Sequence, residues 1–221
     1  MSPAARSVRQ RAAGAAVHEA LRSRVFWILV VVLFANSVAQ NGALTHMAAM
    51  LTDRGIAPAS AAMALSAMGA ASLLGRLFTG ALLDRFQPTR VALALFTIAA
   101  IGTLLLAEAR TLPQGLAAAG LIGAGMGAEA DITPFMLSRY FGLRSFATLY
   151  GFTWTAYAAA GALGPLLMGR AFDLTGSYER LLLILGGVMA GVAALMLAMP
   201  RTVRLKPDAT SYESPLPSTM S

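Results

Sequence analysis

The chain has 221 residues, of which 57% are hydrophobic and 12% are charged, and its net charge is +7. This apolar composition excludes an ordinary water-soluble domain, and the absence of cysteine excludes disulfides and cysteine-based metal or redox sites. The basic residues lie in short segments between apolar runs, without interleaved aromatic residues, so the positive charge does not indicate nucleic-acid binding.

Residues 1–24 are rich in alanine and arginine and carry a single acidic residue, Glu19. They contain no uninterrupted apolar core before a small-residue cleavage site, so we expect no cleaved signal peptide. We predict a basic cytoplasmic arm, in which residues 15–22 are compatible with a surface helix.

Six apolar runs follow, each close to the ~20 residues that cross a bilayer as an α-helix. Short connections that contain turn-forming glycine and proline separate the runs. After Pro200 the chain is polar and rich in proline and serine, which predicts a disordered tail over 201–221. The predicted transmembrane domain, 25–200, has spans at about 25–50, 60–83, 90–108, 113–137, 146–169 and 180–199.

Arginine and lysine indicate the orientation of these spans. When the amino terminus is placed inside the cell, most of the basic residues outside the spans fall in the inner segments. The positive-inside rule therefore predicts that both termini are cytoplasmic, in agreement with an even number of spans.

A pattern of glycine and aspartate occurs twice, at the ends of the predicted second and fifth spans. The two copies are Gly75-x4-Gly80-x3-Asp84 and Gly164-x4-Gly169-x3-Asp173. They occupy the same place in two consecutive three-helix units, and three spans reverse the direction of the chain, so the second unit is expected to be inverted. We predict an all-α integral membrane protein built from two inverted three-helix repeats.

Arg76 is a charged residue within the predicted second span. It lies eight residues before Asp84, which places it about 12 Å from the inner end of its helix and near the middle of a ~30 Å hydrocarbon core. We expect its guanidinium to face the bundle interior and to have an anionic partner. A planar guanidinium is suited to a substrate carboxylate; the alternative is a structural ion pair with a neighbouring helix.

Glu129 and Asp131 are predicted to lie in the fourth span at about the depth of Arg76. Residues two apart on a helix point roughly 200° apart, so the two carboxylates cannot face the same cavity. One is expected to pair with Arg76 or to accept a transported proton, and the other to bond a neighbouring helix or the backbone. We favour Glu129 as the functional acid.

The predicted first span carries a stripe of polar residues, which is costly in contact with lipid and therefore predicts a face toward protein or a water-filled cavity. Gln40 and Asn41 are candidate substrate-binding residues in this stripe. His46, near the outer end, is a candidate proton-linked residue. A hydrogen bond between helices, or a partly solvated position near a loop, is the more common role for such a histidine.

Trp154 and Tyr157 share one face of the predicted fifth span, at i and i+3, and are candidates for lining a substrate cavity. Plain packing is the alternative. The sequence contains no HExxH or CxxC zinc site, no Walker-type glycine loop and no G-x-S-x-G motif. We therefore predict no enzymatic activity, no metal and no cofactor.

Several motifs together resemble the major facilitator superfamily. Gly80-x-Leu82-x-Asp84-Arg85, followed by Arg90, is similar to the cytoplasmic loop signature between the second and third helices of each half. Gly75-Arg76-x3-Gly80 resembles the carboxyl-terminal half of the branch that holds the monocarboxylate transporters and the oxalate/formate antiporters. Three further stretches, 20–27, 138–142 and 164–178, are similar to bacterial members of that branch.

The resemblance implies secondary transport of a small organic anion across the inner membrane of a bacterium, coupled to protons or to another anion, with Arg76 contacting the carboxylate. The chain departs from the family pattern at Gln87-Pro88-Thr89, which interrupt the loop signature, and at Ser72, where monocarboxylate transporters have an acid. The lysine that oxalate-type members carry in the fifth-span helix is also missing.

The family's working unit has twelve spans, and the sequence predicts six. We therefore expect a truncated or split half that needs an amino-terminal six-helix partner, or a chain that pairs with a second copy of itself. The alternative is a non-transporting membrane scaffold, in which Arg76 and Glu129 form a structural ion pair. Besides this partner, the expected partners are the lipid bilayer, the anion and protons, and no nucleic acid.

Overall fold

The computed structural model describes residues 14–200, and these form a bundle of long antiparallel helices. Residues 1–13 of the predicted arm and the predicted tail, 201–221, lie outside the described residues. The helices are α2 (Val17–Arg22), α3 (Arg24–Asp53), α4 (Pro58–Arg85), α5 (Pro88–Glu108), α6 (Leu112–Phe141), α7 (Phe146–Thr175) and α8 (Glu179–Leu195), followed by the 3₁₀ turn η1 (Met196–Ala198).

Proline and glycine set several of the helix ends. Pro58 and Pro88 begin α4 and α5, where the missing N–H of proline costs no hydrogen bond. Gly142 and Gly176 follow α6 and α7 with positive φ angles of 74° and 67°, which glycine adopts without a steric penalty. Each predicted apolar run accordingly coincides with one long helix.

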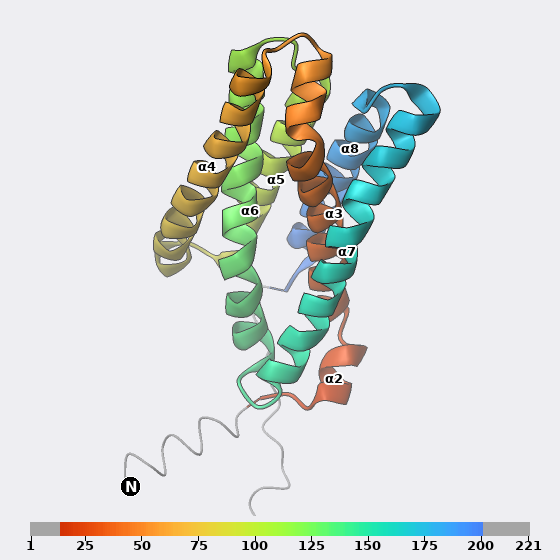
Figure 1. Ribbon diagram of the computed structural model, residues 1–221. Helices are drawn as coiled ribbons and strands as arrows, with labels where there is room; N and C mark the ends of the chain where they lie inside the picture. The colour runs from red at the N-terminus through yellow and green to blue at the C-terminus, as the bar shows by residue number, and fades with distance from the viewer. Residues whose placement is uncertain (1–13, 201–221) are drawn as a thin grey trace, which may run out of the picture.

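The long helices form two layers (Figure 1). In the front layer α3 and α6 lie in the middle, α4 packs against α6 at one edge, and α7 packs against α3 at the other. Behind them, α5 packs against α6 and α8, and α8 also contacts α3. One face of α3 and α6 is therefore left open between α4 and α7.

Small residues bring α4 and α6 into backbone contact. A Cβ atom built on Gly75 would lie 2.5 Å from the carbonyl oxygen of Ala124, and one built on Gly127 would overlap the carbonyl oxygen of Ser72. Close approach of this kind requires residues without a side chain.

The other copy of the glycine pattern makes a similar contact, because a Cβ on Gly164 of α7 would overlap the carbonyl oxygen of Val38 in α3. The first glycine of each sequence copy therefore lies in a close helix contact: Gly75 packs α4 against α6, and Gly164 packs α7 against α3. The inverted repeat itself stays a prediction.

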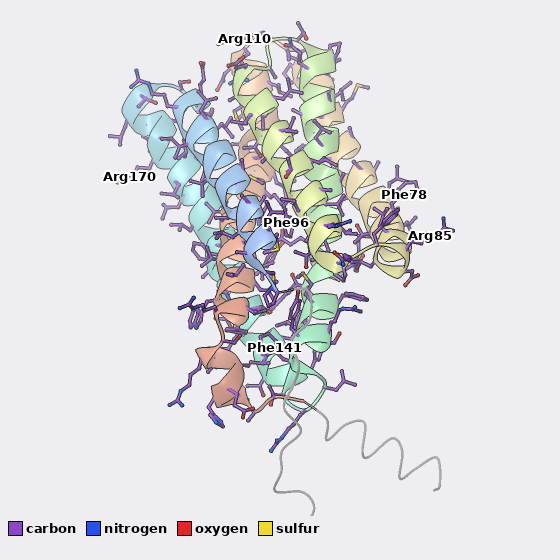
Figure 2. All side chains as sticks on the ribbon, turned by 180° about the vertical axis from the view of Figure 1, so that it is seen from behind. Phe78, Arg85, Phe96, Arg110, Phe141 and Arg170 are labelled. Atoms are coloured by element: carbon purple, nitrogen blue, oxygen red, sulfur yellow. The ribbon has the colours of Figure 1, made fainter. Side chains whose placement is uncertain are left out.

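Large apolar side chains cover the outside of the bundle. Leu77 and Phe78 of α4 are 67% and 64% exposed, and Figure 2 shows Phe78 and Arg85 pointing away from the neighbouring helices. By length and composition, α3, α4, α5 and the segment Glu179–Ala198 are able to cross a membrane. The chain is thus an all-α, multi-pass membrane protein.

The two remaining long helices, α6 and α7, are not among the four that are able to cross a membrane by length and composition. α6 and α7 have 30 residues each, but α6 carries Glu129, Asp131 and several glycines, which lower its hydropathy. That all six helices cross the membrane stays a prediction.

One end of the bundle contains the α4–α5 and α6–α7 connections, and we call it the inner end, after the orientation that the sequence predicts. Here the segment before α2 is bound to the α6–α7 connection: the N–H of Ala15 donates to the carbonyl of Phe141 at 2.8 Å, and the Ser145 hydroxyl donates to the carbonyl of Ala15 at 2.9 Å. The Tyr140 hydroxyl donates to the carbonyl of Pro200 at 2.9 Å. Both ends of the described chain are thus held near the same connection.

At the opposite, outer end, Arg54 closes the carboxyl terminus of α5. Its guanidinium donates to the carbonyls of Leu106, Ala107 and Ala109 at 2.7–2.8 Å. These carbonyls lie at the carboxyl-terminal end of α5, where the regular intrahelical hydrogen bonds run out; the Leu106 carbonyl also accepts from the N–H of Ala109 at 3.4 Å. Burial, and secondarily the charge of Arg110, lowers the pKa of the Arg54 guanidinium from its ordinary value.

Candidate functional site

A cleft of about 70 Å³ opens on the front layer, where α6 and α7 diverge over α3. Most of its lining comes from α6 and α7, and α3 supplies Leu33. The lining residues are Leu33, Met126, Glu129, Ala130, Thr133, Tyr150, Thr153, Trp154 and Tyr157. Glu129, Trp154 and Tyr157, all predicted site residues, are therefore brought together.

The acidic group of the cleft, Glu129, has no ionic partner among the described residues, 14–200. Its side chain is 2% exposed, and neither carboxylate oxygen has a hydrogen-bond partner. Gln40 of α3 is the amide side chain next to it, and the Gln40 amide also lacks a partner in hydrogen-bond geometry. Buried polar atoms normally have hydrogen-bond partners. The unpaired side-chain atoms of Glu129 and Gln40 are therefore able to bind a proton, a water molecule or a ligand.

Asn41, the second candidate substrate-binding residue of α3, takes part in the contact between α3 and α7. Its amide donates to the Ser37 carbonyl at 2.9 Å, and the Ser37 hydroxyl donates to the Tyr157 carbonyl at 3.1 Å. Asn41 also lies beside the hydroxyl of Tyr157. It therefore supports the wall of the cleft and is not among its lining residues.

Four aromatic rings form a ladder along α7. The ring centroids of Phe146 and Tyr150 are 5.7 Å apart, those of Tyr150 and Trp154 are 6.1 Å apart, and those of Trp154 and Tyr157 are 5.1 Å apart. These separations are typical of favourable aromatic pairs. Sequence reasoning identified Trp154 and Tyr157 and missed Phe146 and Tyr150, although the spacing 146, 150, 154, 157 follows one helix face.

Arg76 does not lie in the bundle interior, and that expectation is wrong for this chain. Its side chain is 56% exposed, and its Nη2 atom lies 3.5 Å from Oδ1 of Asp131, which is 32% exposed. Gly75 occupies the contact with α6, and the next residue is turned about 100° around the helix, away from that contact.

The acidic partner of Arg76 is Asp131. The sequence left open which of the two acids would pair with Arg76, and the Arg76–Glu129 ion pair of the scaffold alternative is not formed. The two acids point in different directions from α6, as their spacing predicts. Asp131 points toward Arg76 of α4, and Glu129 points into the cleft, so Asp131 is the acid that pairs with Arg76.

His46 lies apart from the cleft, toward the outer end. Its Nδ1 atom is 3.3 Å from the carbonyl oxygen of Gly42, and its ring centroid is 5.4 Å from that of Tyr178. This hydrogen bond lies within α3, and only the ring contact reaches another element, at the start of α8. The proton-linked role of His46 stays a prediction.

The loop-motif residues Gly80, Asp84, Arg85 and Arg90 lie exposed at the inner end of α4 and the start of α5. Within residues 14–200, no group of three or more histidine, aspartate or glutamate side chains is placed to hold a metal ion.

Comparisons with known proteins agree with this architecture. Residues 2–165 match the family model of the Major Facilitator Superfamily. The chain is 34% identical over 144 residues to "Probable transporter mch1" of Neurospora crassa, in an alignment that covers 52% of this chain and 23% of that protein.

Among solved structures, the fucose:proton symporter of E. coli matches with a TM-score of 0.69 and 20% identity, over 91% of this chain and 46% of the symporter. At this identity the match shows the fold. The chain spans less than half the length of each of these two relatives.

Proposed function

The chain belongs to the major facilitator superfamily, and we propose that it transports a small organic anion by a secondary, alternating-access mechanism. The proposal includes the finer features that the sequence predicts: a relationship to the monocarboxylate and oxalate/formate branch, six spans with both termini cytoplasmic, and a place in a bacterial inner membrane. Secondary transport is supported by the family and by the fold; the anion is inferred from the site.

The observation that carries the proposal is the accessible guanidinium of Arg76. Among residues 14–200, the half-exposed guanidinium of Arg76 contacts one carboxylate, that of Asp131, at 3.5 Å. It therefore keeps most of its hydrogen-bonding capacity for another anion. Exposed ion pairs of this kind are weak. A substrate carboxylate is therefore able to replace Asp131 at the guanidinium without a large energetic cost.

Glu129 is the proposed proton carrier. Burial of an ionised carboxylate without a cation or a hydrogen-bond donor has a large free-energy cost. Acidic residues are therefore rare inside membrane bundles, and those that occur there usually have a function. An anion also enters the cleft more readily when Glu129 is neutral, because two negative charges repel each other in a site of low dielectric constant. Binding of the anion and of a proton would then be mutually favourable.

The proposed working unit is larger than this chain. The aligned symporter is about twice as long, and the described residues of α3, α6 and α7 that line the cleft do not enclose it. The layer that holds these helices has α4 at one edge and α7 at the other (Figure 1). We propose that an amino-terminal six-helix half, or a second copy of the chain, covers this face. Such a partner would exclude water and complete the cavity.

Uptake into proteoliposomes tests the transport proposal. The purified chain would be assayed with radiolabelled carboxylates, and Arg76→Gln would be compared with Arg170→Gln, which removes an exposed arginine of α7 outside the cleft. We expect uptake to fall at least tenfold in Arg76→Gln and to stay near the wild-type rate in Arg170→Gln. Measurable and equal uptake by both variants would contradict the role of Arg76.

A second candidate function is a non-transporting membrane scaffold, and the ion pair between α4 and α6 favours it. If this pair is structural, Arg76→Asp combined with Asp131→Arg should restore the thermal stability that each single substitution removes. Wild-type stability in the swapped variant, together with no carboxylate uptake by any variant, would support the scaffold.

A further inference from the structure

The aromatic ladder of α7 is more than helix packing, because its central ring is left accessible beside the cleft. Trp154 is 56% exposed, although it lines the cleft and its ring lies between those of Tyr150 and Tyr157. A side chain that only fills the core would be covered. The Trp154 ring is instead accessible from the cleft, and its contacts with Tyr150 and Tyr157 fix its orientation.

The other apolar residues of the cleft suit a flat apolar group. Met126 of α6 and Leu33 of α3 line the cleft together with the ladder. A thioether adapts its shape and makes favourable contacts with aromatic rings. A planar ring in this cleft gains ring–ring contacts with Trp154, whereas a branched aliphatic group contacts the aromatic side chains without that interaction.

The ladder and Arg76 flank the same turn of α6. Glu129 points into the cleft and Asp131 points toward Arg76. Ala130, which lies between them, is exposed and also lines the cleft. A small residue therefore lies between the side of α6 that faces Arg76 and the side that faces the cleft.

We propose that the transported anion is a small carboxylate with a planar aromatic body. Arg76 binds its carboxylate, and its ring packs against Trp154 and Tyr157. This substrate class rests on the proposed function, because it assumes that Arg76 binds the anion. Glu129 lines the same cleft, and Gln40 lies beside Glu129. Their unpaired side-chain atoms are therefore available to hydrogen-bond to the ligand or to water.

Tryptophan fluorescence tests this proposal without requiring transport. The chain has two tryptophans, and Trp27 hydrogen-bonds to the carbonyl of Leu21, outside the cleft. Trp27→Phe therefore leaves Trp154 as the sole reporter in the full chain, reconstituted in lipid nanodiscs. The probes are phenylacetate and cyclohexylacetate, which have similar size and the same charge but differ in the planarity of the ring.

We expect phenylacetate to change the Trp154 emission saturably and to bind about three- to tenfold more tightly than cyclohexylacetate, as ring–ring contacts predict. Tyr157→Leu should remove most of this preference. Phe152→Leu, which alters an exposed aromatic residue of α7 outside the cleft, should preserve it. Arg76→Gln should weaken the binding of both acids.

The contrary outcomes separate this inference from the proposed function. Equal affinity for the two acids, together with weaker binding in Arg76→Gln, would overturn the aromatic subsite and leave an anion transporter. Phenylacetate binding that is unchanged in Arg76→Gln would overturn the assignment of the carboxylate to Arg76. No emission change with either acid, in a chain that also takes up no aliphatic carboxylate, would overturn both proposals.

Discussion

The guanidinium of Arg76 lies 3.5 Å from the carboxylate of Asp131, so the two side chains join α4 to α6 at the edge of the open face. Asp131 therefore competes with any anion that binds Arg76. Because both side chains are partly exposed, this competition is weak enough to be reversed during a transport cycle.

Asp131→Asn should consequently strengthen anion binding. Removal of the competing charge is expected to lower the apparent Kd for a carboxylate roughly two- to fivefold, the range that corresponds to an exposed ion pair. Isothermal titration in nanodiscs would measure this change. Asp173→Asn, which neutralises an exposed acid near the end of α7, is the matched control and should leave the Kd unchanged. A weaker affinity in Asp131→Asn would contradict the competition.

Glu129→Gln should uncouple uptake from the proton gradient. Glutamine keeps the shape of the side chain and cannot release a proton, so uptake driven by an imposed pH gradient should fall to the rate measured without a gradient. Thermal stability should be unchanged or higher, since a neutral side chain costs less to bury. Glu179→Gln, at the outer end, is the control. Gradient-driven uptake at the wild-type rate in Glu129→Gln would exclude this residue as the proton carrier.

Gly127→Ala should separate α4 from α6. The added methyl group would overlap the carbonyl oxygen of Ser72, and overpacking of this kind costs about 1–3 kcal/mol. Gly120→Ala is a matched control on the same helix, because nothing lies within 4 Å of its Cβ position. Thermal unfolding in detergent should show a lower midpoint only for Gly127→Ala. Equal midpoints would mean that the helices shift at no cost.

Arg54→Gln should destabilise the outer end of the bundle by about 1–3 kcal/mol, because three helix-end carbonyls lose a charged donor. Arg54→Lys should recover only part of the loss, since an ammonium cannot reproduce the planar fork. Arg110→Gln removes an exposed ion pair with Glu179 and should cost less than about 1 kcal/mol. Denaturant titration of the three variants would rank them, and an equal effect of Arg54→Gln and Arg110→Gln would contradict the capping role.

The sequence was sufficient for the helices, because both signals that define them are local. Apolar runs set their length, and residues such as Pro58, Pro88 and Gly142 set their ends. The divergence of Glu129 and Asp131 was equally predictable, since it follows from the angle between successive residues of a helix.

The environment of Arg76 was not predictable in the same way. The depth of Arg76 in the helix follows from counting residues, but its exposure depends on which face of α4 meets α6. Gly75 lies in that contact, and Arg76 is therefore turned away from α6 and exposed. The ladder was predicted only in part. The spacing of Phe146 and Tyr150 places them on the helix face of Trp154 and Tyr157, but the ring-to-ring contacts that join the four residues follow only from the structure.

The attachment of Ala15 to Phe141, and of Tyr140 to Pro200, brings the first and last described residues to one end of the bundle. A tandem duplication of such a unit needs only a linker that stays on one side of the membrane. Two bundles could be fused in one gene without an additional crossing helix, and a single-chain dimer of this protein is thus accessible to genetic engineering as well as to evolution.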